Sequence, residues 1–550
     1  MEMKPAGKQE RTDTHPTAMA RARRRVTQPR GLVREKAQPL APARRQDRDD
    51  MGAVVASRNR DRNAISSVRA LANQAFSRAA GAPLIEGNAI RLLKDAQENY
   101  PAWLEAICAA KHHIHFENYI VYEDDVGRMF ADALIEKAQQ GVRVRLIYDW
   151  LGGLGKASRS FWRRLRAAGV EVRCFNPPRW HSPLHWLSRD HRKMIAVDGE
   201  VGFVTGLCVG RMWVGIPEKK LDPWRDTGVE VRGPSVADIE QAFADVWAMM
   251  GAPIPEGELV RREDIAPQGE AALRVVASVP ATAGLLRVDQ LVAALARDRL
   301  WLTDAYYAGT TSYAQALCAA AQDGVDVRLL VPNATDLPLL KPLSRAGYRP
   351  LLEAGVRIFE WNGTMLHAKT AVADGRWARV GSTNLNIASW FGNCEMDVVV
   401  EDEPFARLME ETYLEDLENA TEIVLDDRQK LRATNQPRHT HRVLTSGGGS
   451  GGRAAAGALR IGNAVGAVIK NRRVLEPVEA RIAATVGVGL LALAVLFALF
   501  PRLLAYPLAL VCAWLGCALL YSGYRLHRVK TRRKRAAKSS SKAQSVERHK

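Results

Sequence analysis

The sequence predicts an α/β protein whose core consists of two similar halves, followed by two hydrophobic helices. Short β-rich runs alternate with helical stretches from about residue 61 to 430, as expected for an α/β fold. Segments of the first half recur in the second, which indicates a duplication. Two apolar runs, 482–500 and 503–521, then follow near the end of the chain.

The clearest repeated unit is a helix that ends at a glycine and leads directly into a strand. It occurs in FADALIEKAQQGVRVRLIYDW around Gly141 and again in YAQALCAAAQDGVDVRLLVPN around Gly324. A second pair of such units is LRAAGVEVRCFN in the first half and LLEAGVRIFEWN in the second. Because both units occur in the same order in each half, we expect the halves to share one topology.

Each half then reaches one copy of the motif H-x-K-x4-D. The two copies contain His191, Lys193, Asp198, His367, Lys369 and Asp374. One copy is expected by chance in roughly a few per cent of chains of this length, and two copies in roughly one in a thousand. The doubled motif therefore marks the candidate functional site.

The residue types of this motif suit the chemistry of a phosphodiester. In a β-hairpin, histidine and lysine two positions apart lie on the same face of a strand, and the aspartate lies near the turn. If the halves pack about a pseudo-twofold axis, two imidazoles and two ammonium groups converge. One imidazole can then attack phosphorus to form a phosphohistidine while the other protonates the leaving oxygen. The lysines would stabilise the charge on the nonbridging oxygens.

We expect neither a metal ion nor another cofactor in this protein. The nearby lysines would oppose a divalent cation, so Asp198 and Asp374 fit a supporting role in orienting the strands or a histidine. The seven cysteines are scattered without a CxxC pair, which suggests neither a disulfide framework nor a zinc site.

The motif-bearing segments resemble the phospholipase D superfamily and, within it, the bacterial cardiolipin synthases. The resemblance covers about residues 85–425 and rests on DHRKMIAVDGEVGFVTG, on WRDTGVEVRGP and on GSTNLNIASW followed by NCEMDVVV. It implies two tandem phospholipase D-like α/β sandwich domains related by pseudo-twofold symmetry. It also implies that the two H-x-K-x4-D copies together form one active site.

The resemblance adds candidate substrate-binding residues around these motifs: Ser382, Asn384, Asp226, Glu395 and Thr205. It places the two acids where each would hydrogen-bond the active histidine of the opposite half. The alternative is that they are surface charges at the starts of strands. One departure from the family pattern is Cys208, because the family commonly has Gly-Gly-x-Asn where this chain has TGLC.

The resemblance implies a phosphatidyltransferase that makes cardiolipin from two molecules of phosphatidylglycerol and releases glycerol. His191 is then the expected nucleophile and His367 the expected acid. One alternative is a hydrolase that releases phosphatidic acid, since only the acceptor hydroxyl differs. A nuclease and a non-catalytic lipid-binding protein are further alternatives.

The apolar runs favour a membrane over nucleic acid as the partner of this basic chain, whose formal net charge is +18. Each run has 19 residues without a charge and is long enough to span a bilayer, although a buried soluble hairpin is the alternative. Both outer flanks are basic and the turn carries only Arg502, so the positive-inside rule places both flanks on the cytoplasmic side. We therefore expect a transmembrane hairpin in the bacterial inner membrane, with the catalytic domain and both termini cytoplasmic. The expected partners are anionic phospholipids, and no nucleic acid is expected.

These observations divide the chain into six segments. They are a disordered basic arm at 1–60, domain 1 at 61–260, domain 2 at 261–430, a flexible linker and juxtamembrane segment at 431–475, the transmembrane hairpin at 476–527 and a basic tail at 528–550. Within domain 1 the additional segment PPRWHSPLHWLSRD could line a pocket mouth or touch lipid headgroups, and simple loop packing is the alternative.

Overall fold

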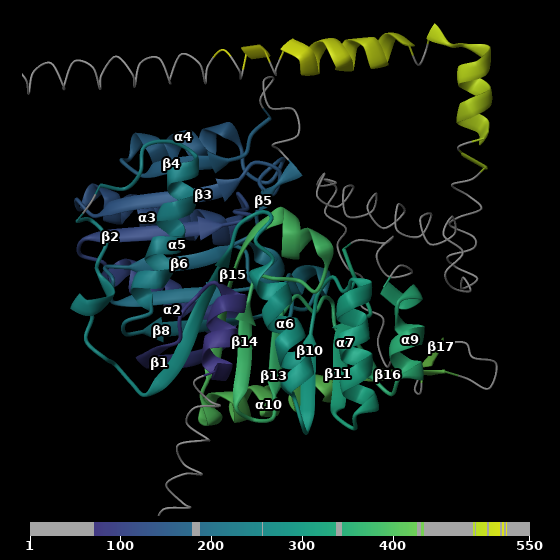
Figure 1. Cartoon of the computed structure of the whole chain (residues 1–550). Helices are drawn as coiled ribbons and strands as arrows, with labels where there is room; N and C mark the ends of the chain where they lie inside the picture. Colours follow the sequence, from purple (N-terminus) through teal and green to yellow (C-terminus); the bar gives the residue numbers. More distant parts are fainter. Residues whose placement is uncertain are drawn as a thin grey trace, which may run out of the picture. The chain divides into compact units, whose positions relative to one another are not determined.

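The structure is a computed structural model of the chain (Figure 1). It describes residues 71–178, 187–255, 257–336, 344–425 and 431–433, together with 488–489, 491–502, 505–517, 520–521 and 524. The expected N-terminal arm, most of the linker, the basic tail and the tryptophan-containing part of PPRWHSPLHWLSRD lie outside the described residues.

The first half is a mixed sheet with helices on both faces. Its elements are β1 (Ile85–Lys94), α2 (Asp95–Ala109), β2 (His113–Asn118), α3 (Asp125–Gln139), β3 (Arg143–Asp149), α4 (Arg159–Ala167), β4 (Glu171–Phe175), β5 (Arg189–Asp190), β6 (Lys193–Val197), β7 (Val201–Thr205), β8 (Thr227–Arg232) and α5 (Val236–Met249). The strand order is β4–β3–β2–β6–β7–β8–β1. The pairs β4–β3 and β3–β2 are parallel, and the others are antiparallel.

The second half repeats this arrangement. Its elements are β9 (Ala271–Ser278), α6 (Gly284–Leu295), β10 (Arg299–Thr303), α7 (Thr311–Gln322), β11 (Asp326–Pro332), α9 (Tyr348–Glu353), β12 (Arg357–Trp361), β13 (Thr370–Ala373), β14 (Trp377–Gly381), β15 (Asn393–Glu401), α10 (Glu403–Glu418), β16 (Ala420–Leu425) and β17 (Leu431–Ala433). The order β12–β11–β10–β13–β14–β15–β9 matches the first half strand for strand, with β16 and β17 added beside β12. The predicted α/β class is confirmed, and the two halves share one strand order.

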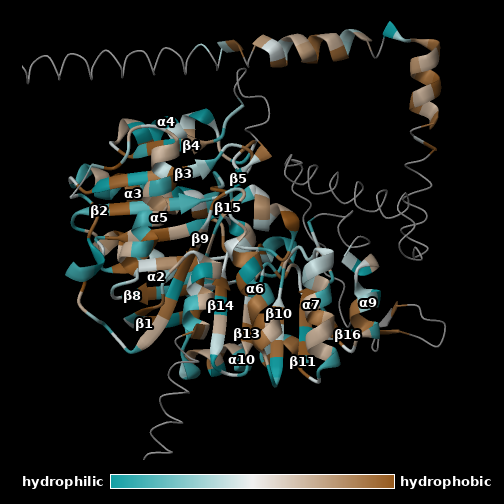
Figure 2. Ribbon diagram, viewed as in Figure 1, coloured by the Kyte–Doolittle hydropathy of each residue, from teal (hydrophilic) through white to brown (hydrophobic). Residues whose placement is uncertain are grey.

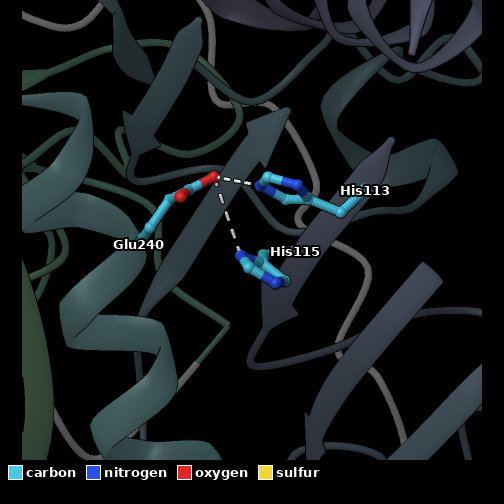
Figure 3. A group of neighbouring side chains, drawn as sticks. All are labelled: His113, His115 and Glu240. Atoms are coloured by element: carbon cyan, nitrogen blue, oxygen red, sulfur yellow. Dashed lines mark hydrogen bonds and ion pairs between the residues drawn. The ribbon is translucent and has the colours of Figure 1, made fainter. Parts of the chain in front are cut away.

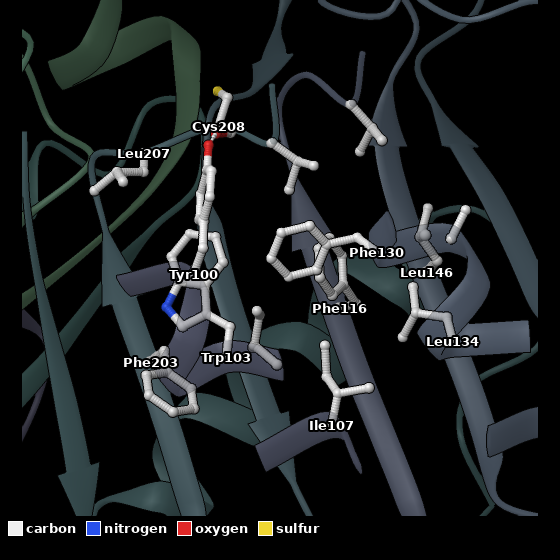
Figure 4. Close-up of a cluster of buried hydrophobic side chains, with 14 of the residues drawn as sticks. Tyr100, Trp103, Ile107, Phe116, Phe130, Leu134, Leu146, Phe203, Leu207 and Cys208 are labelled. Carbon is white, nitrogen blue, oxygen red and sulfur yellow. Dashed lines mark hydrogen bonds between the residues drawn. The ribbon is translucent and has the colours of Figure 1, made fainter. Parts of the chain in front are cut away.

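The two sheets meet where β1 pairs with β9 in antiparallel register. In the first half, α2, α3 and α4 cover one sheet face through a cluster that includes Trp103, Phe116 and Phe130, all at most 1% exposed (Figure 4). The central cluster contains side chains of α5 and α10 together with strand residues of both halves. Figure 2 shows the corresponding brown, hydrophobic bands along the central strands. Because one cluster draws on both halves, burial of apolar surface holds them together.

The helix–glycine–strand units fold as the sequence predicts. Helices α3 and α7 begin after Asp124 and Thr310, whose side chains accept hydrogen bonds from the N–H groups of Gly127 and Tyr313. They end just before Gly141 and Gly324, which have φ of 91° and 96°. Glycine adopts this left-handed conformation without steric cost, so it allows the chain to leave the helix and enter β3 or β11.

The expected transmembrane hairpin is only partly described. Residues 491–499 and 505–517 are helical, and Figure 2 shows them as largely hydrophobic. Within the described part of the chain, however, no single helix combines the length and apolar character needed to cross a membrane. The hairpin therefore stays a prediction.

The helix–glycine–strand junction predicts a specific stability effect. The substitution Gly324→Ala is expected to lower the free energy of unfolding by about 1–2 kcal/mol, because a Cβ atom disfavours the left-handed backbone conformation. The added methyl itself meets no atom within 4 Å, so steric overlap does not contribute. Urea denaturation followed by circular dichroism measures the change. Gly392→Ala is the control, since that glycine also has open space but no positive φ. Equal losses in both variants would contradict the explanation.

Candidate active site

The two histidines of the repeated motif are anchored by backbone hydrogen bonds that cross between the halves. The N–H of His191 donates to the carbonyl of Cys394 at 2.9 Å. In the reciprocal contact, the N–H of His367 donates to the carbonyl of Arg225 at 2.7 Å. Parallel pairing of β5 with β15 supports the first contact, and a parallel bridge between Arg225 and Leu366 supports the second. Each imidazole is therefore placed by the opposite half of the protein.

Each imidazole also contacts a carboxylate of the opposite half. Nδ1 of His191 lies 2.9 Å from Oε2 of Glu395, and Nδ1 of His367 lies 2.7 Å from Oδ2 of Asp226. Both acids are 0% exposed, so the alternative interpretation as surface charges is wrong. An ionised carboxylate only accepts hydrogen bonds, so Nδ1 of each ring carries a proton. Nε2 of each neutral ring then keeps its lone pair for chemistry.

The electrostatic environment keeps the acids ionised and the imidazoles neutral. Burial opposes ionisation of Asp226, but contact with the imidazole of His367 and the charge of Lys369 lower its pKa to about 2. The pKa of Glu395 is also lowered, because contact with His191 outweighs burial. Burial lowers the pKa of His191, and burial together with Lys369 lowers that of His367 to about 3.

The two lysines of the motif are buried beside the histidines. The ammonium group of each donates to the backbone carbonyl of the histidine in its own motif, and Nζ of Lys369 lies 2.9 Å from Nδ1 of His367. Burial lowers the pKa of Lys369 to about 8. The charge of Lys369 also lowers the pKa of His191, and that of Lys193 lowers the pKa of His367. The structure therefore brings both histidines and both lysines into one electrostatic environment.

The two motif aspartates lie apart from the imidazoles, in the turns of their hairpins. Both adopt a left-handed backbone, with φ of 56° at Asp198 and 51° at Asp374. Their carboxylates accept hydrogen bonds from three consecutive backbone N–H groups each, at 2.7–2.9 Å, from Lys111, His112 and His113 and from Arg297, Asp298 and Arg299. Each aspartate thus ties its hairpin to the start of β2 or β10, which agrees with a supporting role.

The three candidate polar residues near the motifs have different surroundings. The hydroxyl of Ser382 donates to Oε2 of Glu395 at 2.6 Å, so this serine fixes the carboxylate that contacts His191. The hydroxyl of Thr205 accepts the N–H of Leu207 at 3.1 Å and thereby shapes the chain after β7. Among the described residues, the side-chain oxygen of buried Asn384 has no hydrogen-bond partner. Asn384 is therefore the one of the three whose side chain is available to a substrate.

Cys208 occupies the position in the first half that Asn384 occupies in the second. It is 2% exposed, and its backbone carbonyl accepts a hydrogen bond from the hydroxyl of Tyr100 at 2.6 Å (Figure 4). Burial raises the pKa of its thiol, so the group stays protonated. The first half thus lacks the amide that the second half provides.

Sequence reasoning missed the aromatic residues that hold the imidazoles. The indole N–H of Trp213 donates to Oδ2 of Asp226 at 2.9 Å. The ring of Tyr119 meets that of His191 edge-on with 4.9 Å between centroids, and Tyr306 approaches His367 similarly at 5.8 Å. Tyr119 directly follows β2, whereas Tyr306 lies three residues after the end of β10, so the two tyrosines share no repeated sequence position that could have identified them.

The turn aspartates predict a test that separates a structural role from a catalytic one. Asp198→Ala removes the acceptor of three N–H groups and is expected to lower the free energy of unfolding by on the order of 3 kcal/mol. Asp198→Asn keeps one oxygen and tolerates the left-handed backbone, so its cost is smaller. Unfolding midpoints and the activity of the folded fraction are measured together. Lost activity with unchanged stability would instead assign the carboxylate a catalytic role.

Comparison with known proteins identifies the family of this chain. A family model described as "Cardiolipin synthase, PLD-like domain" matches residues 103–213 and 292–417. The cardiolipin synthase of Alkalihalophilus pseudofirmus is 33% identical over 345 residues, covering 62% of this chain and 68% of the relative. Cardiolipin synthase A of Pseudomonas aeruginosa is 34% identical over 369 residues, covering 66% and 74%.

A solved structure supports the fold. The phosphatidylserine synthase of Haemophilus influenzae superposes with a TM-score of 0.51, covering 71% of this chain and 98% of that one. At 14% identity this likeness concerns the fold alone. Together with the family match and the relatives at one-third identity, it leads to one conclusion. The chain belongs to the phospholipase D-like family of cardiolipin synthases.

Proposed function

We propose that this protein is a phosphatidyltransferase that makes cardiolipin from two molecules of phosphatidylglycerol and releases glycerol. The observation that carries the proposal is the reciprocal pairing of each imidazole with a buried carboxylate of the opposite half, at 2.9 Å and 2.7 Å. This pairing leaves two Nε2 atoms for nucleophilic attack and proton transfer. The identity of donor and acceptor is supported by the relatives, which are named cardiolipin synthases.

In the first half-reaction, Nε2 of His191 attacks the phosphorus of the first phosphatidylglycerol. The bond from phosphorus to the headgroup oxygen breaks, and His367 gives that oxygen a proton so that glycerol leaves. In the second half-reaction, a hydroxyl of another phosphatidylglycerol returns a proton to His367 and attacks the phosphohistidine. The phosphorus–nitrogen bond breaks, cardiolipin forms and both imidazoles return to their starting states.

The remaining groups stabilise charge during these steps. Lys193 and Lys369 place positive charge beside the imidazoles, where negative charge develops on the phosphoryl oxygens. The amide of Asn384 can donate to the same oxygens. Glu395 and Asp226 hold the rings in the reactive tautomer and stabilise the positive charge that each ring acquires.

The acid must gain its proton before it can act. In the free site, burial and the neighbouring Lys369 hold the pKa of His367 at about 3. A bound phosphodiester anion raises this pKa through its negative charge, so protonation of the acid is coupled to substrate binding. Without substrate, the imidazoles therefore stay neutral.

Transfer to an alcohol is favoured over hydrolysis by the burial of the site. His191 is 9% exposed and His367 is 5% exposed, so little of either ring faces water. A lipid hydroxyl held at the site has a much higher effective concentration than a molecule in bulk solution. Hydrolysis to phosphatidic acid uses the same intermediate and is the competing outcome.

We also propose that the hydrophobic C-terminal segments anchor the catalytic part to the cytoplasmic face of the inner membrane. The support is the sequence of the two 19-residue apolar runs and their basic flanks. Anchoring would hold the site at the surface where its anionic lipid substrates are concentrated.

The central test incubates purified full-length protein with labelled phosphatidylglycerol in mixed micelles, beside His191→Ala and His367→Ala. Cardiolipin and glycerol in equal amounts are expected from the unaltered protein. Both variants should lose turnover by at least about 10³-fold, because the nucleophile and the acid are each required. Retained lipid binding by the variants, measured by flotation with vesicles, shows that substrate capture survives.

Other products would redirect the proposal. Phosphatidic acid in place of cardiolipin identifies a hydrolase. Full activity in both alanine variants excludes the imidazole mechanism. Samples are taken during rapid turnover, and mass spectrometry locates the residue that carries the acid-labile phosphate. We expect this residue to be His191. Modification of His367 instead would overturn the assignment of the nucleophile.

The lowered pKa of His191 predicts the acid limb of the pH dependence of kcat, which reports the substrate complex, where the bound phosphodiester keeps His367 protonated. The nucleophile must be neutral, so the rate falls as the pH drops through the pKa of His191, which burial holds below its ordinary 6.5. The acid limb is therefore expected below pH 6.5. Glu395→Gln removes a negative charge that raises this pKa, so the limb should move to still lower pH while the rate falls by about 10²–10⁴ at every pH. A limb that moves to higher pH would refute this explanation.

A further inference from the structure

Three buried side chains far from the H-x-K-x4-D motifs in sequence form a second polar cluster. His113 and His115 project from β2, two positions apart, and Glu240 projects toward them from α5 (Figure 3). Nε2 of His113 lies 2.6 Å from Oε1 of Glu240, and Nδ1 of His115 lies 3.8 Å from the same oxygen. All three residues are at most 4% exposed.

This cluster has polar atoms without hydrogen-bond partners. Among the described residues, neither ring nitrogen of His115 has a partner, and Oε2 of Glu240 has none either. A neutral imidazole has one donor and one acceptor, and burying both without partners is strongly unfavourable. A side chain that is 0% exposed in this state indicates that something else completes its bonding.

The second half shows what the same position looks like without imidazoles. There Arg299 forms an ion pair with Glu410 at 2.9 Å, and Trp301 donates from its indole to Asp326 at 3.1 Å. The equivalence is direct, because Asp198 binds the N–H of His113 and Asp374 binds the N–H of Arg299.

The stacking partners are also equivalent, since His115 stacks on Phe243 of α5 and Trp301 stacks on Tyr413 of α10. The first half therefore keeps the glutamate but has two imidazoles in place of the arginine and the tryptophan. The arginine compensates the charge of Glu410, although Oε1 of Glu410 also has no hydrogen-bond partner among the described residues. In the first half, Oε2 of Glu240 and both ring nitrogens of His115 have no such partner.

The chemistry of this set matches a divalent transition metal. Two neutral imidazole nitrogens and a carboxylate are the ligands found at many zinc sites. Burial lowers the pKa of His115 well below its ordinary value, so its ring is neutral and able to coordinate. The candidate ligand atoms all lie within 4.8 Å of one another. Zinc bonds of about 2.0–2.2 Å require only small side-chain movements from this arrangement.

Nearby positive charges are compensated. Arg143 and Arg145 on β3 lower the pKa of His115, but both pair with Glu258, at 3.1 Å and 2.7 Å. Arg145 also lies 3.4 Å from Glu171. The glutamates therefore limit the repulsion that these arginines exert on a bound cation.

We propose that His113, His115 and Glu240 bind one divalent transition-metal ion of the zinc class and thereby fasten α5 to β2. β2 pairs with β6, which carries Lys193, and α5 packs on β6 and β7. The ion stabilises the sheet that positions one lysine of the candidate active site. It takes no part in the imidazole chemistry, and the proposal departs from the sequence-based expectation that the protein holds no metal ion.

The test uses full-length protein without a polyhistidine tag, which is stripped with a chelator, incubated with zinc and dialysed to remove unbound metal. Zinc bound after dialysis is counted by elemental mass spectrometry, and cobalt titration reports coordination through its visible absorption. About one zinc ion per chain is expected for the unaltered protein. The thermal unfolding midpoint should rise when zinc is added back.

Two ligand variants and one matched control decide the assignment. His115→Phe keeps an aromatic ring against Phe243, and Glu240→Gln keeps the shape of the side chain. Each is expected to weaken zinc binding by at least about 100-fold and to abolish the zinc-dependent rise of the midpoint. The control His112→Ala removes an exposed neighbouring imidazole and should bind zinc as the unaltered protein does.

Opposite results overturn the proposal. It fails if the unaltered protein binds no stoichiometric zinc or cobalt, or if both ligand variants bind the metal as tightly as the control. If one variant does not fold by circular dichroism, the other decides, because each removes a different ligand. Equal zinc binding by the folded variant and by the control is then the overturning result.

Discussion

The candidate active site depends on one reciprocal contact between the halves. Each histidine gives its backbone N–H to a carbonyl of the other half, and the residue after that carbonyl supplies the carboxylate for the same imidazole. Cys394 is followed by Glu395, and Arg225 is followed by Asp226. One strand contact thus fixes both the backbone and the ring. Neither half alone contains both a motif histidine and the carboxylate that contacts it, so the site requires both halves packed together.

This contact also explains how so many ionisable groups remain buried. Lys193 and Lys369 are at most 1% exposed, which would be strongly unfavourable without compensation. Asp226 and Glu395 stay ionised beside them, and histidine carbonyls accept hydrogen bonds from the ammonium groups. Burial and the charges of the two lysines lower the pKa values of the imidazoles, whereas the carboxylates act in the opposite direction. The reactive state of the rings is therefore set by the network that makes burial of the lysines tolerable.

Much of this could be predicted from the sequence, because glycine junctions, strand periodicity and the doubled motif are local signals. They indicated the α/β class, the duplication and the residues that would meet. Other features depend on contacts between distant segments. Ser382 contacts a carboxylate instead of standing free, Trp213 supports Asp226, and Glu240 meets His113 across 127 residues. No spacing rule anticipates such contacts, since each depends on how separate elements pack together in the folded protein.

The duplication has left the two halves chemically different, and the geometry explains one difference through another. Gly206 stands where the second half has Ser382, and a side chain there would overlap Oδ1 of Asp226. A serine beside this aspartate is therefore excluded, and the indole of Trp213 supplies the hydrogen bond instead. In the second half the longer Glu395 leaves room for the Ser382 hydroxyl. The two imidazoles thus have unlike supports, which suits a reaction in which one ring attacks and the other transfers the proton.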